Sequence, residues 1–78
     1  MITDLTVLSR NKIVALLEAS GYNETSKDII EADYVNNFNG QVKYLIKFHD
    51  INDNICHDYI YIFIRDGKIV ADYWERII

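Results

Sequence analysis

The apolar residues of this chain change their spacing at Ile29, and this change constrains the fold more than any other feature of the sequence. After Ile29 they alternate with the period of two that is typical of strands. Before it they recur at the 3.6-residue period of an amphipathic helix, on a face made by Leu5, Leu8, Ile13, Leu16 and Ala19. One helix is therefore expected to precede an extended remainder.

The helix is predicted to run over about residues 4–20. A start near Asp4 is preferred to a start at Ser9, because the latter would place Arg10 in the first turn, where the helix dipole is positive. Gly21 follows the segment and is expected to end it, since glycine readily adopts the left-handed conformation there.

Turn signals divide the extended remainder into four predicted strands, at about residues 29–37, 41–49, 55–65 and 68–77. Asn39-Gly40 and Asp66-Gly67 are typical hairpin turns, and a polar stretch over residues 50–54 joins the middle pair. Residues 1–78 are thus predicted to form a single α+β domain, with one helix packed on a four-stranded antiparallel meander.

The register of the first hairpin follows from matching apolar faces. A two-residue turn at Asn39-Gly40 would place Tyr34 opposite Leu45 and mix apolar with polar sets, so a three-residue loop over residues 38–40 is predicted. The predicted pairs are Ile30 with Phe48, Ala32 with Ile46, Tyr34 with Tyr44 and Asn36 with Val42.

In the last hairpin a two-residue turn at Asp66-Gly67 matches the faces directly. One face then pairs Ile64 with Ile69, Ile62 with Ala71 and Ile60 with Tyr73, and the opposite face pairs Phe63 with Val70, Tyr61 with Asp72, Tyr59 with Trp74 and His57 with Arg76. The lone helix covers only one of these faces. An uncovered aromatic face is typical of an interaction surface.

The composition excludes several classes of protein. The chain has 78 residues, of which 50% are hydrophobic, and no Pro, which excludes disordered and low-complexity classes. A single cysteine forms no internal disulfide, so the small core is marginal and a partner or self-association is expected. No apolar run is long enough for a membrane helix and residues 1–4 lack a secretory signal, so a cytoplasmic location without membrane contact is expected.

Metal binding and catalysis find little support in the sequence. Potential metal ligands crowd into one segment without a known ligand spacing, and they are His49, Asp50, Asp53, Cys56, His57 and Asp58. A solvated polar loop with Cys56 packed at the sheet edge explains them better. No nucleophile motif or phosphate loop is present, so we expect neither an enzyme nor a cofactor.

The leading functional hypothesis is a non-enzymatic protein-binding module, such as a small inhibitor, antagonist or immunity-type protein of a phage or bacterium. The predicted partner-binding residues are Tyr59, Tyr61, Phe63, Trp74, Lys47, His57 and Arg76. Two alternatives remain open. The same face could be buried in a homodimeric accessory protein, or it could stack single-stranded nucleic acid, although the net charge of −4 and nearby carboxylates weaken the latter.

Overall fold

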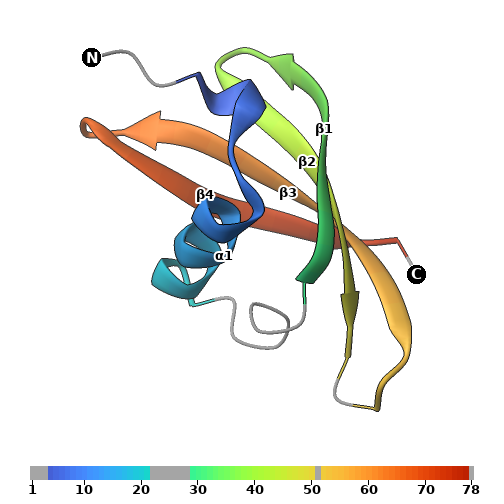
Figure 1. The fold of residues 1–78 in the computed structure, drawn as a ribbon. Coiled ribbons are helices and arrows are strands. Elements are labelled where there is room, and N and C mark those ends of the chain that lie inside the picture. Colours follow the sequence, from blue (N-terminus) through green and yellow to red (C-terminus); the bar gives the residue numbers. More distant parts are fainter. Residues whose placement is uncertain (1–3, 22–28, 51, 78) are drawn as a thin grey trace.

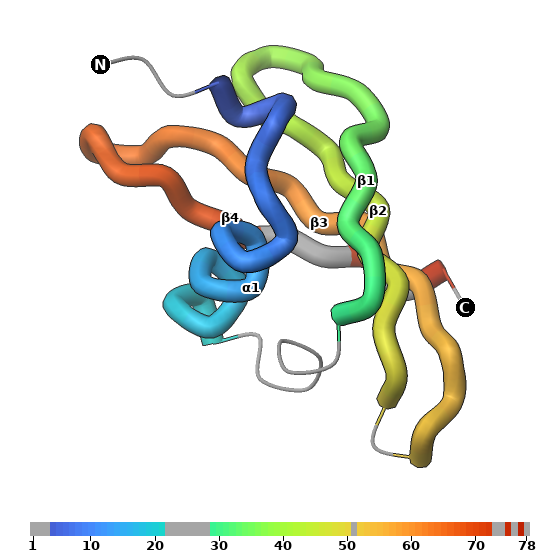
Figure 2. The backbone as a smooth tube through the Cα atoms, viewed as in Figure 1, coloured from blue at the N-terminus to red at the C-terminus, as the bar shows by residue number. Residues whose placement is uncertain are grey.

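The computed structural model describes residues 4–21, 29–50 and 52–77, without the side chains of residues 73, 74 and 76. A helical segment precedes four antiparallel strands in the sheet order β1-β2-β3-β4 (Figures 1 and 2), which confirms the predicted α+β fold. The elements are η1 (Leu5–Val7), α1 (Arg10–Ala19), β1 (Ile29–Phe38), β2 (Gln41–His49), β3 (Ile55–Arg65) and β4 (Lys68–Arg76). The strands begin and end within one residue of their predicted positions.

The first hairpin has a tighter turn than predicted. Phe38 pairs directly with Gln41, and both turn residues have positive φ, 52° for Asn39 and 80° for Gly40, as a two-residue type I′ turn requires. The three-residue loop is therefore wrong. Two bulges in β1, rather than a longer loop, match the apolar faces of the two strands. Each bulge inserts one residue and so moves the following side chains to the other face.

Because of the bulges, the central pairs of the first hairpin agree with the predicted register and the pairs at its two ends differ from it. The central pairs, Ala32 with Ile46 and Tyr34 with Tyr44, are confirmed. The pairs at both ends are wrong by one residue: Phe48 lies opposite Ile29 rather than Ile30, and Val42 lies opposite Asn37 rather than Asn36.

A third bulge alters the last hairpin. The predicted pairs Ile64 with Ile69, Phe63 with Val70 and Ile62 with Ala71 are confirmed. Beyond them the register shifts by one residue in β4, and the pairs become Tyr61 with Tyr73, Ile60 with Trp74, Tyr59 with Glu75 and Asp58 with Arg76. The predicted pairs Ile60–Tyr73, Tyr61–Asp72, Tyr59–Trp74 and His57–Arg76 are therefore wrong.

The helical segment is also divided differently from the prediction. A short 3-10 helix is capped by Asp4, and the α-helix starts only after Ser9, whose Oγ accepts a hydrogen bond from the Lys12 N–H at 3.1 Å. The predicted continuous helix from residue 4 is wrong: the α-helix begins at this cap, in spite of the unfavourable charge of Arg10 in its first turn. None of the described helices is long and apolar enough to cross a membrane.

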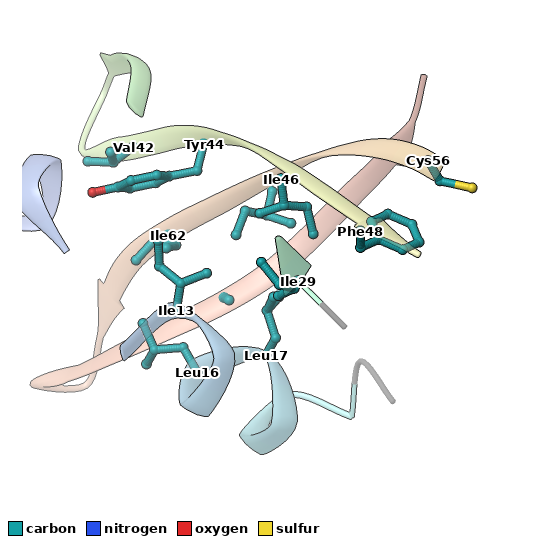
Figure 3. Packing of buried hydrophobic residues seen from close by; sticks show 12 residues of the cluster. Ile13, Leu16, Leu17, Ile29, Val42, Tyr44, Ile46, Phe48, Cys56 and Ile62 are labelled. Carbon is teal, nitrogen blue, oxygen red and sulfur yellow. The ribbon is translucent and has the colours of Figure 1, made fainter. Parts of the chain in front are cut away.

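The core lies between α1 and one face of the sheet, called here the inner face (Figure 3). The helix contacts both edge strands, β1 and β4, and so spans the inner face between them. Every second residue is buried from Val42 to Phe48 in β2 and from Cys56 to Ile62 in β3. The buried apolar residues are Ile13, Leu16, Leu17, Ile29, Val42, Tyr44, Ile46, Phe48, Cys56, Ile60, Ile62 and Ala71.

The replacement Ser9→Ala is expected to lower the free energy of unfolding by about 1 kcal/mol, because it removes the N-cap acceptor of α1. Urea unfolding followed by circular dichroism measures this change. The exposed neighbour Asn11 provides the control, since Asn11→Ala leaves the cap intact. Equal stability of Ser9→Ala and wild-type protein would show that the helix does not depend on this cap.

Candidate interaction surface

The face of the sheet opposite α1, called here the outer face, is left uncovered by the described helices, which both lie on the inner side (Figure 1). Directly paired residues of an antiparallel sheet share a face, so the strand register identifies its members. The central part pairs Lys43 with Tyr61, Leu45 with Tyr59 and Lys47 with His57. All these side chains are half-buried, because they shield one another.

Cations lie over the aromatic rings of the outer face. The Lys43 Nζ is 3.9 Å from the centroid of the Tyr59 ring and 5.8 Å from that of Tyr61. The Arg65 guanidinium lies 5.0 Å from the Phe63 ring centroid. These distances fall within the range of cation–π attraction. The rings and the basic side chains therefore form one continuous layer.

Carboxylates flank this layer along both edge strands. On β1, Glu31 lies opposite Lys47 and Asp33 lies opposite Leu45. On β4, the Asp72 carboxylate accepts a 2.8 Å hydrogen bond from Arg65, in an ion pair whose two side chains are more than half exposed. Such an exposed pair contributes little stability, typically below about 1 kcal/mol. The outer face thus has a basic and aromatic centre with acidic margins.

The structure brings together most of the side chains predicted for partner binding. Tyr59, Tyr61 and Phe63 alternate along β3, and His57 and Lys47 are direct cross-strand neighbours at one end of the row. The His57 Nδ1 is shielded and has no hydrogen-bond partner among the described residues.

The remaining two predicted residues, Trp74 and Arg76, have side chains outside the described part of the structure. Their Cα partners are Ile60 and Asp58, not Tyr59 and His57. The predicted adjacency of Trp74 to Tyr59, and of Arg76 to His57, is therefore wrong at the level of the backbone. Their part in binding stays a prediction.

Sequence reasoning missed Phe38 as a member of this surface. With the two-residue turn, Phe38 pairs with Gln41, and Gln41 is next to the inner-face residue Val42, so Phe38 belongs to the outer face. Its side chain is 73% exposed, the highest value among the exposed aromatic residues of the described chain. The Asn-Gly dipeptide was the available signal, because it is the usual sequence of a two-residue type I′ turn.

The polar β2–β3 loop is organised by Asp50. Its Oδ1 accepts hydrogen bonds from the backbone N–H groups of Asn52 at 2.9 Å and Asn54 at 2.8 Å, and its Oδ2 accepts one from the Cys56 Sγ at 3.7 Å. The hydrogen bond from the Asn54 backbone lowers the pKa of Asp50 most; burial opposes it, and further hydrogen bonds from Asn52, the Asn54 side chain and Cys56 keep the pKa below its ordinary value. Asp50 therefore acts as a turn-forming residue.

The neighbouring strand residues differ from the predicted solvated loop. Cys56 is 6% exposed, as expected for packing at the sheet edge, but Asp58 is only 1% exposed and lies on the inner face. Within residues 4–21, 29–50 and 52–77, no three side chains of the His, Cys, Asp or Glu type gather in a way that would hold a metal ion.

Acid is expected to destabilise the protein partly through Asp50. A lowered folded-state pKa means that the ionised carboxylate stabilises the fold above its ordinary pKa of about 4, and that this contribution is lost as the pH falls through the folded-state value. The replacement Asp50→Asn keeps an oxygen acceptor and should flatten the acid side of the stability profile. Urea unfolding measured across the acid range tests this, with Asp53→Asn as the control in the same loop; equal slopes in both variants would contradict it.

Comparison of the chain with family models, with curated proteins and with solved structures finds no match. The surface described above is therefore assigned from its own chemistry.

Proposed function

We propose that this protein is a non-enzymatic protein-binding module that acts by occupying a partner's surface through the outer face of its sheet. One observation carries the proposal: the rings of Tyr59, Tyr61 and Phe63 form a row on the face opposite α1, where the described helices leave them uncovered. Aromatic residues with adjacent cations are the typical composition of interface hot spots. Small inhibitors, antagonists and immunity-type proteins work in this way.

The arrangement of cations favours a protein partner over single-stranded nucleic acid. Stacking platforms offer open ring faces to the bases. A base that stacks on the occupied side of Tyr59 must displace the Lys43 ammonium, 3.9 Å from the ring centroid. The carboxylates of Glu31 and Asp33, which share this face, also repel phosphates.

The proposal is tested by comparing wild-type protein with the double variant Tyr59→Thr/Tyr61→Thr. Threonine keeps the strand propensity and removes both rings. Gel filtration with light scattering first gives the oligomeric state, and affinity capture from a bacterial lysate then compares the bound proteins. We expect a partner that wild-type protein captures and the double variant loses, with circular dichroism unchanged.

A variant on the inner side serves as the matched control. Val14→Thr changes a half-buried residue of α1 that packs on the core side, so it should keep the captured partner. Capture that survives loss of both tyrosines would refute the proposal. A wild-type dimer that the double variant converts to monomer would instead support the homodimer alternative.

A further inference from the structure

Lys43 occupies a position that any partner on the outer face must cover. Its ammonium lies over the rings of both Tyr59 and Tyr61, so a surface that contacts these rings also removes water from the Lys43 Nζ. A cation–π contact offsets part of the lost hydration. Burial of the remaining charge is costly unless an anion pairs with it.

The protein does not supply that anion itself within its described part. Arg65 is paired with Asp72, and among the described residues no ion pair involves Lys43. The direct cross-strand neighbours of Lys43 are Asn36 on one side and Tyr61 on the other, neither of which is a carboxylate. A carboxylate on whatever covers the rings would supply this anion.

We infer that the occupant of the outer face is a protein segment that places a carboxylate against Lys43, between apolar side chains that contact Tyr59 and Tyr61. This inference rests on the proposed function and names the chemistry of its partner. Lys47 lies four residues along β2, about 13 Å away on the same face. It already lies opposite the carboxylate of Glu31, whereas Lys43 lies opposite Asn36.

The acidic margins of the outer face favour a partner whose negative charge lies at the centre, against Lys43. Glu31 and Asp33 on β1 would repel a uniformly acidic surface, while basic groups at the partner's rim would face them favourably. Exposed rim pairs contribute little affinity, so the contact at Lys43 is expected to be the larger electrostatic determinant.

A random-peptide display library provides the probe. Selection on wild-type protein is followed by removal of every peptide that also binds Tyr59→Thr/Tyr61→Thr, which leaves binders of the outer face. We expect these binders to carry Asp or Glu beside apolar residues. They should bind Lys43→Met about 10- to 100-fold more weakly, because the methionine keeps the apolar stem and removes the charge that pairs with the carboxylate.

The matched control is Lys47→Met, which removes a cation of the same strand that lies over none of the aromatic rings within the described residues. Its loss of affinity should be smaller than that of Lys43→Met. Outer-face binders that lack acidic residues, or that bind Lys43→Met as tightly as wild type, would overturn the inference and leave the proposed function standing. Failure to obtain any outer-face binder would count against the proposed function itself. If wild-type protein is a dimer and removal of the rings abolishes that dimer, the occupant of the outer face is a second copy of this chain.

Discussion

The replacement Ile60→Ala is expected to lower the free energy of unfolding by about 2–5 kcal/mol, the usual result of a cavity at a fully buried aliphatic site. Ile60 is 0% exposed and faces α1. A domain of 78 residues has a total stability of about 4–12 kcal/mol, so this single change brings the protein close to unfolding at room temperature.

The adjacent replacement Tyr61→Thr is expected to cost about 1 kcal/mol or less, although tyrosine is the larger side chain. Tyr61 points to the outer face, where it is half-buried by its neighbours and lies under none of the described helices. The replacement removes contacts with neighbours on the outer face and leaves the core on the inner face intact, and threonine suits a strand. The contrast between two successive residues of β3 therefore measures which face of the sheet is the core.

Urea unfolding at two protein concentrations checks both values. A loss in Tyr61→Thr as large as that in Ile60→Ala would mean that the outer face is buried in the folded state. If that loss also grew with protein concentration, the rings would belong to a dimer core. Either result would remove the surface on which the proposed function depends.

The limits of sequence-based prediction in this fold are set by its bulges. The alternation of apolar residues predicts the strands, and it correctly assigns Ile60 and Ile62 to the opposite face of the sheet from Tyr59 and Phe63. A bulge inserts one residue and reverses the faces of everything beyond it. The bulge in β4 follows Ala71, so the pairing was right up to that residue and wrong for Trp74.

The break between η1 and α1 could not be predicted for a different reason. It depends on Tyr44, more than thirty residues away in β2, whose hydroxyl binds the backbone at the break. Local sequence carries only part of that information, namely Ser9 as a good cap. The cation positions over the rings are likewise tertiary, since Lys43 reaches Tyr59 across strands.

The replacement Tyr44→Phe is expected to lower the free energy of unfolding by about 1–3 kcal/mol. The Tyr44 hydroxyl donates a hydrogen bond to the Leu5 carbonyl at 2.6 Å and accepts one from the Leu8 N–H at 3.0 Å. Both backbone groups lie where the helical hydrogen bonding is interrupted, and they lose their partner when phenylalanine takes this position. The ring itself still fills its place in the core.

Alkaline pH tests the same contact independently. Burial raises the pKa of Tyr44, which outweighs the opposing hydrogen bond from the Leu8 backbone, while Asp4 and Tyr34 raise it slightly further. Its stabilising contribution is therefore fully present below the unfolded pKa of about 10 and is lost as the pH rises through the higher folded-state value. Tyr44→Phe has no such proton to lose, so its stability should fall less between neutral pH and pH values above about 10.

Tyr34→Phe is the matched control, because the Tyr34 ring lies edge-on to that of Tyr44 at 6.2 Å but is 45% exposed. It should change the stability at neutral pH by no more than about 0.5 kcal/mol, and it keeps the Tyr44 hydroxyl and so most of the loss of stability at alkaline pH. If Tyr44→Phe matched this control in both measurements, the hydroxyl would not anchor the N-terminal segment to the sheet. The position of η1 over the inner face would then need another explanation, because the hydroxyl joins this segment to β2 at both Leu5 and Leu8.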